Sequence, residues 1–350
     1  MIQLTTSIPS LNFLSSIPNL EVKYDGEALR VELLHIDKGG KQTVILLESL
    51  YKDTDGVATV RDIRGLIEPY TNKTLSTSFR FYLKDSNSSK NIDFTVLYSL
   101  TEINIGAEDF ALNYFLTKMM GDKEVLPNSP EYLHFLAVKP VTVTAELAFW
   151  KDGEIKLENK DIATSTGNYE LVTLDVSPDK LSTTDTNGEL IGYVIKAGDR
   201  VARYSVNNDL LVNGPTFLFT NSFGCQEVFV CKGVTEVDQT FKREHGYVND
   251  YFKTVFAEEE RIYKAETGVM DEFTAILAEE LLRSHEIYLM RGKLPFKEVA
   301  IKASNAKKDS YLGSNPSYTL DYRLAQRNHN IMDLKSEGRI FDQTFDKTFN

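Results

Sequence analysis

Two tight groups of glutamates are the residues of this chain best placed to supply paired carboxylates. Glu258–Glu260 are consecutive, and Glu279 is followed directly by Glu280. Glycoside hydrolysis needs two carboxyl groups that converge on one bond from either side. Adjacent side chains point in different directions on a helix or a strand, which favours a solvated face for both groups. A carboxylate-dependent hydrolase therefore remains only a minor alternative.

The other reactive residue types form no catalytic or ligand-binding pattern in the sequence. The five histidines are scattered, and His285 and His329 are typical of surface or helix-terminal positions. Cys225 and Cys231 would lie about 20 Å apart on an extended strand, too far for a disulfide, so we expect two buried thiols. The sequence contains no phosphate-binding glycine loop, nucleophile elbow or zinc-binding helix motif. We therefore expect no catalytic residue, no cofactor and no metal.

Four aromatic residues are candidates for binding a ligand or a partner instead. Trp150 directly precedes the turn Lys151-Asp152-Gly153, where it could stack on a sugar ring or anchor the end of a hairpin. Phe341, Phe345 and Phe349 lie close to the C-terminal residue. Such an apolar terminus either packs on its own domain or docks on a neighbouring molecule.

The elements that must position these residues are mostly strands. Runs such as ALRVELLHI, QTVILLESLY and STSFRFYLK alternate β-branched or aromatic residues with polar ones, which predicts strands of sandwich or barrel domains. Asp-Gly pairs at residues 25–26, 55–56 and 152–153 predict tight turns between such runs. The aromatic-rich segment 247–263 fits a helix or a β-hairpin, and we favour strands.

Three segments predict helices by their spacing of apolar residues. The segment 59–70 opens with Thr59 and Asp62 in the pattern of a helix start and closes before Pro69. The segment 108–120 is followed by Gly121, a plausible C-terminal stop. The segment 271–285 carries the strongest apolar stripe, made of Phe273, Ile276, Leu277, Leu281 and Leu282.

The changes in the pattern of apolar and polar residues along the chain predict a mainly β protein. In it, two β-sandwich-like domains are followed by an α+β C-terminal domain. The first 22 residues, interrupted by Pro9 and Pro18, are interpreted as an extended N-terminal arm, with an edge strand of the first domain as the alternative. The predicted divisions are an arm over 1–22, a β-rich domain with short helices over 23–135, a β-sandwich over 136–233 and an α+β domain over 234–350.

Composition and charge exclude several function classes. The 350 residues carry 39 Lys+Arg against 51 Asp+Glu, a formal net charge of −12, whereas binding a phosphate backbone requires concentrated positive charge. All three predicted domains are acidic, so we expect no nucleic-acid recognition. An uninterrupted apolar stretch of about 18 residues, as needed for a membrane span, does not occur.

One long segment resembles a known class of proteins. The residues that carry the resemblance begin with Thr220-Asn221-Ser222-Phe223-Gly224-Cys225-Gln226-Glu227, in which an Asn-Ser-x-Gly turn precedes a strand. Glu280–Ser284, Glu286–Tyr288, Val299–Ile301 and Tyr318–Asn328 follow in order. Together they resemble uncharacterised virion structural proteins, of tail or baseplate, from phages and prophages of Bacteroidetes-type bacteria. The resemblance covers about residues 217–330.

The resemblance implies a structural virion component without catalytic residues. Its expected function is a ring or adaptor of a phage tail or baseplate, assembled by subunit packing around the tail axis. The expected partners are other copies of the chain and neighbouring tail or baseplate proteins, and the expected location is the virion, assembled in the host bacterial cytoplasm. The alternative is a glycan-binding β-sandwich module for host or surface attachment, acting through Trp150 and exposed tyrosines.

Overall fold

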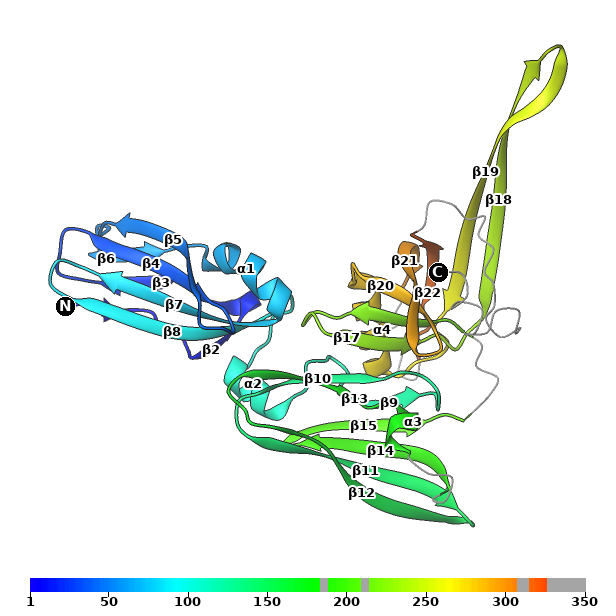
Figure 1. Cartoon of the computed structure of the whole chain (residues 1–350), viewed down its shortest axis with the longest axis horizontal. Coiled ribbons are helices and arrows are strands. Elements are labelled where there is room, and N and C mark those ends of the chain that lie inside the picture. The colour runs from blue at the N-terminus through cyan, green and yellow to red at the C-terminus, as the bar shows by residue number, and fades with distance from the viewer. Residues whose placement is uncertain (183–187, 209–213, 307–314, 326–350) are drawn as a thin grey trace, which may run out of the picture.

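Three β-rich units follow one another along an elongated molecule in the computed structural model (Figure 1). The structure describes residues 1–182, 188–208, 214–306 and 315–325. It confirms the predicted fold class: the chain is mainly β, with two two-sheet units followed by a sheet with a helix packed on it.

The first unit is a sandwich of two sheets with one helix. Its five-stranded sheet has the order β2-β8-β7-β4-β5, and its three-stranded sheet the order β1-β3-β6. Every second residue of the central strands is buried, as the pleat of a half-solvated sheet requires, and these side chains fill the core between the sheets. The elements are β1 Gln3–Leu4, β2 Leu11–Phe13, β3 Leu20–Lys23, β4 Leu29–Ile36, β5 Gln42–Leu50, β6 Val57–Val60, α1 Ile63–Thr74, β7 Ser76–Lys84 and β8 Ser89–Leu97.

The segment 1–22 belongs to this sandwich, which corrects its interpretation as an extended arm. β1 pairs antiparallel with β3, and β2 pairs parallel with β8. Leu14 and Leu20 are fully buried in the core of the unit. The apolar residues of the segment are thus covered by the same chain, and the edge-strand alternative holds.

Two of the three predicted helices differ from the structure. α1 begins after Asp62, whose carboxylate accepts a hydrogen bond from Gly65 N, whereas Thr59 lies in β6. The helix continues past Pro69 to Thr74 because Ile63 and Ile67 hold it on the core. The second helix, α2, spans only Ala107–Asn113 of the expected 108–120.

α2 ends early because the next apolar residues point into different cores. Phe115 packs in the core of the second unit, and Leu116 packs in the cluster that joins the units. A continued helix could not place these neighbouring side chains in separate cores, and Leu116 N donates to His134 O instead of to a helix carbonyl.

The second unit is also a two-sheet sandwich. Its larger sheet has the order β12-β11-β14-β15-β9, and β10 pairs with β13 in the smaller one. Buried residues of β10, β11 and β14 form the core between the sheets. The elements are β9 Asp122–Val125, β10 Tyr132–Ala137, β11 Val141–Lys151, β12 Glu154–Ser165, β13 Glu170–Asp175, α3 Pro178–Leu181, β14 Glu189–Ala197 and β15 Arg200–Val206.

The third unit is a seven-stranded sheet in the order β17-β16-β20-β21-β22-β19-β18, with α4 packed on it. α4 starts at the N-cap Asp271, whose carboxylate accepts from Thr274 N at 2.7 Å, so the third predicted helix is confirmed. The elements are β16 Thr216–Thr220, β17 Gln226–Val230, β18 Thr235–Val248, β19 Tyr251–Glu266, α4 Glu272–Arg283, β20 Ile287–Arg291, β21 Leu294–Asn305 and β22 Thr319–Leu324.

The pairing of strands moves both expected domain boundaries. β9 pairs in parallel with β15 and β10 pairs with β13, so the second unit starts before residue 135. β16 and β17 pair with each other and β16 with β20, so the third unit starts before residue 233. Except for the local hairpin β16–β17, these pairs join residues far apart in the sequence, and no local pattern signals them.

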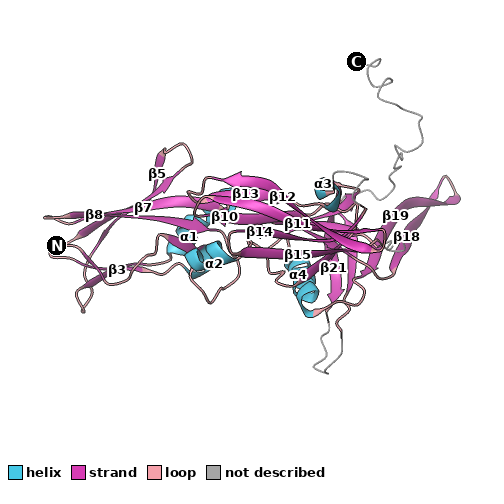
Figure 2. Cartoon of the chain, turned by 90° about the horizontal axis from the view of Figure 1, so that it is seen from below, coloured by secondary structure: helices cyan, strands magenta, loops and turns pink. Residues whose placement is uncertain are grey.

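β18 and β19 form a long hairpin that projects from the body of the molecule (Figure 1). β19 pairs with β22 only through Tyr263–Glu266, so the rest of the hairpin is a two-stranded ribbon. Strands over the segment 247–263 are thereby confirmed. Seen from below, the ribbon lies at the end of the molecule opposite the N-terminus (Figure 2).

Candidate functional site

The outer part of the β18–β19 hairpin exposes an unusual number of large apolar side chains. Monomeric proteins rarely leave such residues together in water, and contiguous exposed patches mark interaction sites. We call this set the hairpin tip; its members are all at least 45% exposed and are Phe241, Tyr247, Val248, Tyr251, Phe252, Val255 and Phe256.

The strand register places an aromatic group on one face of the tip. Tyr247 lies directly opposite Phe252, with ring centroids 5.4 Å apart. His245, two residues before Tyr247, stacks on Phe252 at 5.2 Å with nearly parallel rings. The three rings support one another across the ribbon, so they form a preformed apolar surface rather than three independent side chains.

Polar side chains separate the tip from the base on the same face of the hairpin, where Gln239, Glu259 and Arg261 contact one another. Val237 lies opposite Tyr263, and Tyr263 stacks on Tyr322 within the core of the third unit. The aromatic rings of the tip are therefore a separate apolar group and not an extension of the core near Tyr263.

The glutamates of the hairpin are used in ion pairs rather than as a convergent pair. Glu259 binds Arg261, and Glu260 binds Lys302 at 2.8 Å. Glu259 and Glu260 point to opposite faces of the ribbon, as adjacent strand residues must. In α4, Glu279 binds Arg283 and Glu280 binds Lys118 at 2.7 Å. Neither group forms a convergent pair, but Glu280 is buried, so the expected solvated face is wrong for the pair on α4.

Trp150 lies at the outer end of β11 and is 47% exposed. Asp152 and Gly153, both with positive φ, form the tight turn to β12, as predicted. Trp150 faces Ile155 across the hairpin, and Leu157 follows on the same face as Ile155. Ile155 and Leu157 are 58% and 80% exposed. Trp150, Ile155 and Leu157 thus form a second bare apolar surface, the Trp150 patch. The other three candidates, Phe341, Phe345 and Phe349, lie outside the described residues.

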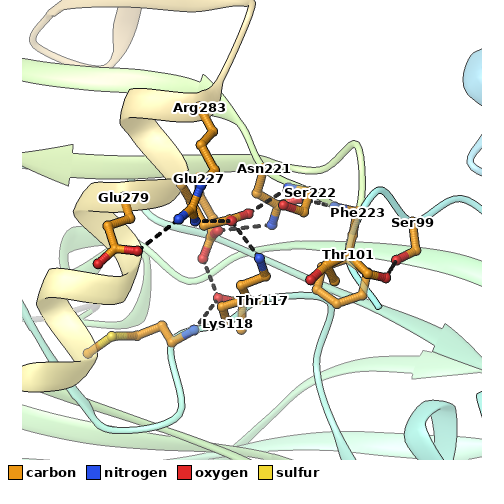
Figure 3. A network of polar contacts seen from close by, with 12 residues as sticks. Ser99, Thr101, Thr117, Lys118, Asn221, Ser222, Phe223, Glu227, Glu279 and Arg283 are labelled. Atoms are coloured by element: carbon orange, nitrogen blue, oxygen red, sulfur yellow. Dashed lines mark hydrogen bonds and ion pairs between the residues drawn. The ribbon is translucent and has the colours of Figure 1, made fainter. Parts of the chain in front are cut away.

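A buried polar network connects the three units around Asn221 (Figure 3). The Asn221 side chain donates to Leu116 O and to Glu227 Oε2, both at 2.9 Å, and its Oδ1 accepts from Phe223 N and Cys225 N. Both donor hydrogens and both acceptor lone pairs of the amide are therefore used. The network fixes the turn 221–225 against the chain that leads from α2 to β9.

The turn 221–225 inserts its apolar residue into the place where the units meet. Phe223 is 2% exposed and stacks on Phe110 of α2 at 5.4 Å. Leu11 and Phe13 of the first unit and Leu136 of the second line the same cluster. The backbone adds a bond between units, from Leu100 N to Ser222 O at 2.8 Å. This cluster, with the network above it, forms what we call the junction.

Two buried glutamates lie beside the junction. Burial raises the pKa of Glu227, although Lys123, Thr117 and Asn221 act in the opposite direction. Burial likewise raises the pKa of Glu131 to about 7, although Lys123 lies within 2.5 Å and lowers it. Lys123 lowers the pKa of both carboxyl groups, so one cation is shared between two buried glutamates.

Arg200 is a buried basic side chain whose direct contacts are carbonyl groups and an aromatic ring. The Arg200 guanidinium donates to the carbonyls of Ala111, Leu136 and Ala197 and lies over the Phe135 ring. Burial lowers its pKa to about 10. Through Ala111 O this arginine caps the last turn of α2, where a positive charge is favoured.

His134 connects β10 to the third unit. Its ring nitrogens lie 3.0 Å from Thr173 Oγ1 and 2.9 Å from Gln226 O, and burial lowers its pKa. His285 is exposed just after α4, as expected, while His329 lies outside the described residues. His134 is therefore a satisfied interior histidine that joins two units.

An open hollow of about 940 Å³ separates the first unit from the third above the junction. Charged side chains of both signs line it, among them Lys118, Glu280 and Arg283. Lys118 and Glu280 pair with each other, and Glu280 also accepts from Ser222 N at 2.8 Å. The charges on this wall thus serve to hold α4 on the junction. In the part of the chain that the structure describes, no group of three or more His, Cys, Asp or Glu side chains is arranged to hold a metal ion.

Sequence reasoning missed both the junction and the hairpin tip as sites. The aromatic density of 247–263 was the available signal for the tip, but it indicates strands without saying that the strands leave the body. The Asn-Ser-x-Gly turn was noted only for its resemblance, and the partners of Asn221 lie up to about 105 residues away in the sequence. Cys225 and Cys231 are buried and free, as expected, and they flank β17.

Comparisons with known proteins add little to this description. No protein-family model matches the chain, and no curated protein matches it. A chimeric titin Z1Z2-Z1Z2 tandem functionalized with a fibronectin peptide is similar at 14% identity over 59% of this chain and 100% of that chain, with a TM-score of 0.18. The N-terminal eight Ig domains of the Down syndrome cell adhesion molecule are similar at 9% identity over 75% of this chain and 38% of that chain, with a TM-score of 0.21. Likenesses this weak carry no argument about function.

No helix among the described residues has the length and apolar character to cross a bilayer.

Proposed function

We propose that this chain is a structural component of a phage tail or baseplate, a ring or adaptor protein that works by packing against copies of itself and neighbouring tail proteins. The observation that carries the proposal is the projecting β18–β19 hairpin, which holds rigid aromatic side chains in water at the end of a ribbon. An apolar surface so far from the body has no use in stabilising its own fold. Its contribution comes from contact with another molecule.

The construction of the body supports the same proposal. The junction holds three β units with buried hydrogen bonds and an apolar cluster, so the base of the hairpin and the Trp150 patch sit at fixed positions relative to each other. A closed ring requires such fixed geometry, because each subunit must present its contacts at a set angle to the next. The proposed place of action is the virion, with assembly in the bacterial cytoplasm.

The function is tested by following the chain during phage production. A host strain carrying the gene with an epitope tag is induced, particles are purified on a density gradient, and the tag is located by immunogold electron microscopy. We expect the tag in the particle fraction, at the tail or baseplate. Recovery of the tag only in the particle-free supernatant would contradict the proposal.

Glycan binding through Trp150 is the alternative, favoured by the exposure of this side chain at the end of β11. A sugar platform combines an aromatic ring with polar groups that bind the hydroxyls. The nearest members of the patch, Ile155 and Leu157, are aliphatic, which suits a protein partner better. A glycan array separates the two: a signal that Trp150→Ala abolishes would favour the module, and an array without signal would favour a structural role.

A further inference from the structure

We propose that a hollow between the first and second units binds a neutral saccharide. The hollow has a volume of about 510 Å³ and lies where β4 ends and β7 begins, opposite the loop that leads from β12 to β13. Hollows of about 300–1,000 Å³ at the interface of two units are common binding places for small ligands. The inference goes beyond the proposed function and does not depend on where the chain acts.

The first unit contributes a row of hydroxyl groups to the hollow. On the outer face of its sheet Ser78 lies opposite Thr95, with 3.2 Å between the two hydroxyl oxygens, and Ser76 lies two residues away on the same side of β7. The alternate residues of β7, Phe79 and Phe81, fill the core. A hydroxyl group donates one hydrogen bond and accepts two, so this row keeps hydrogen-bonding capacity toward the hollow.

The opposite wall is a loop of the second unit with an unusual backbone. Gly167, Asn168 and Tyr169 follow one another with φ values of 84°, 64° and 58°. A left-handed backbone is uncommon for residues other than glycine, above all for one as bulky as tyrosine. Gly167 lies directly against the backbone of Lys139, where a Cβ would come within 2.6 Å of the carbonyl carbon. The surrounding chain thus fixes the loop, and strained backbone of this kind occurs preferentially at functional sites.

Both walls present polar groups that can bind a ligand. Within the described part of the chain, the Ser76 hydroxyl, the Asn168 amide and the Tyr169 hydroxyl form no side-chain hydrogen bond with the protein, and His35 makes only ring contacts. Ser76, His35 and Tyr169 are half-buried, and Asn168 is exposed. Two of the four come from each unit and all line the same hollow, so a ligand seated there contacts both walls at once.

The chemistry of the lining selects a neutral, hydroxyl-rich ligand. Hydroxyl and amide groups match the hydroxyls of a sugar, because both partners donate and accept. Among the described residues that line the hollow, Lys38 is the one lysine or arginine, against the carboxylates of Asp37 and Glu170. A phosphate or sulfate group therefore meets net negative charge. Asp37 already accepts from two backbone amides and Glu170 from Ser165, which leaves these carboxylates fewer lone pairs for a cation.

A glycan array with neutral, sialylated and sulfated saccharides tests the class of ligand. We expect the full chain to retain neutral saccharides, and the signal to survive Trp150→Ala because Trp150 does not line the hollow. The neutral di- or trisaccharide with the strongest signal then serves as the probe for titration calorimetry. An array on which no neutral saccharide is retained, or a neutral signal that Trp150→Ala abolishes, would overturn the inference.

Variants of the two walls test the place of binding. Ser76→Val removes a hydroxyl from a strand, and Asn168→Asp replaces an amide by a carboxylate in a residue type that tolerates a left-handed backbone. We expect S76V/N168D to bind the probe about tenfold more weakly. The matched control is S49V/N249D, since Ser49 lies on β5 and Asn249 has a φ of 49° in the hairpin turn; its affinity is expected to equal that of wild type. Equal affinities for the two double variants would contradict binding in this hollow.

Hydrogen exchange on the wild-type chain gives a readout that does not depend on how the variants fold. Saturation with the probe is expected to slow exchange in residues 167–171 and at the start of β7, and to leave residues 150–157 unchanged. Protection that is confined to other segments would overturn the inference. The presence of the chain in tail particles is measured separately, so neither result decides the other.

Discussion

Tyr247 and Phe252 face each other across the β18–β19 hairpin with ring centroids 5.4 Å apart, while 78% and 64% of their surfaces remain exposed. Paired aromatic rings on a two-stranded ribbon stabilise the ribbon by about 0.5–1.5 kcal/mol beyond their burial. This gain is small compared with the unfavourable free energy of exposing so much apolar surface to water. The stability of the hairpin therefore does not account for these exposed rings, whereas contact with another molecule would.

Asn221→Ala is expected to weaken the junction strongly. The change removes two donors and one acceptor from a buried site and leaves Glu227, Phe223 N and Cys225 N short of partners. We expect a loss of about 2–4 kcal/mol in the free energy of unfolding, because unsatisfied buried groups keep their full desolvation cost. Urea denaturation measures it. Asn113→Ala, which removes one exposed bond to Asp109 O, is the control and is expected to cost under about 0.5 kcal/mol.

Gly224→Ala separates steric contact from backbone strain. Gly224 has φ +74, and a Cβ there would lie 2.4 Å from Leu75 Cδ2, a residue of the first unit. Gly56 has nearly the same φ, +75, with nothing within 4 Å. Both alanines lose about 1 kcal/mol to the left-handed conformation, and only Gly224→Ala also requires the side chains of Leu75 and Tyr98 to shift. Thermal unfolding is expected to show a clearly larger loss for Gly224→Ala, and equal losses would refute the close contact.

Glu131 is expected to make stability fall as the pH rises. Its pKa is raised by burial from 4.5 to about 7, so the folded chain holds a proton that the unfolded chain releases. Where the folded state binds more protons, the free energy of unfolding decreases with pH, here from about pH 4.5 to pH 7. The stabilising term is complete below that window and lost above it, with a size of at most about 3 kcal/mol.

Glu131→Gln checks this assignment by urea denaturation across the same window. The amide stays neutral throughout, so the variant is expected to lose less stability than wild type between the two ends. An unchanged slope would show that another group, for example Glu227 with its raised pKa, causes the dependence.

Arg200→Met is expected to destabilise the contact between α2 and the second unit. The change keeps much of the side-chain volume but leaves the carbonyls of Ala111, Leu136 and Ala197 without their donor. We expect a loss of about 2–4 kcal/mol. Arg203→Met on the same strand, at an exposed position, is the control with an expected change within about 0.5 kcal/mol. Similar midpoints for the two variants in guanidinium would contradict the role of Arg200.

Strands, a helix and a turn that depend on neighbouring residues could be predicted from the sequence. Alternation predicted strands such as β4 and β7 because one face of each is buried, and the N-cap Asp271 with its apolar stripe predicted α4. Likewise the Asp152-Gly153 turn was evident, since few dipeptides adopt two positive φ angles so readily.

What could not be predicted depends on pairing over long distances. β9 has four residues and no strong pattern, and only its parallel contact with β15 assigns it to the second unit. The partners of Asn221 and Arg200 come from segments that no spacing rule connects. Exposure is similarly hidden: β18 and β7 both contain aromatic and β-branched residues typical of strands, yet β7 lies over a core and most of β18 is exposed to water.

The short anchoring of the hairpin also affects how an assembly would form. β22 pairs only with Tyr263–Glu266 of β19, so no third strand supports the outer ribbon. We therefore expect the outer ribbon to bend about its base. Fixing it on docking costs conformational entropy, so each single contact is weaker than its aromatic content suggests. Weak contacts break and re-form, which lets a misplaced subunit leave before the last one closes the circle. Once closed, every subunit is held on two sides, and the assembly becomes far more durable than any one of its joints.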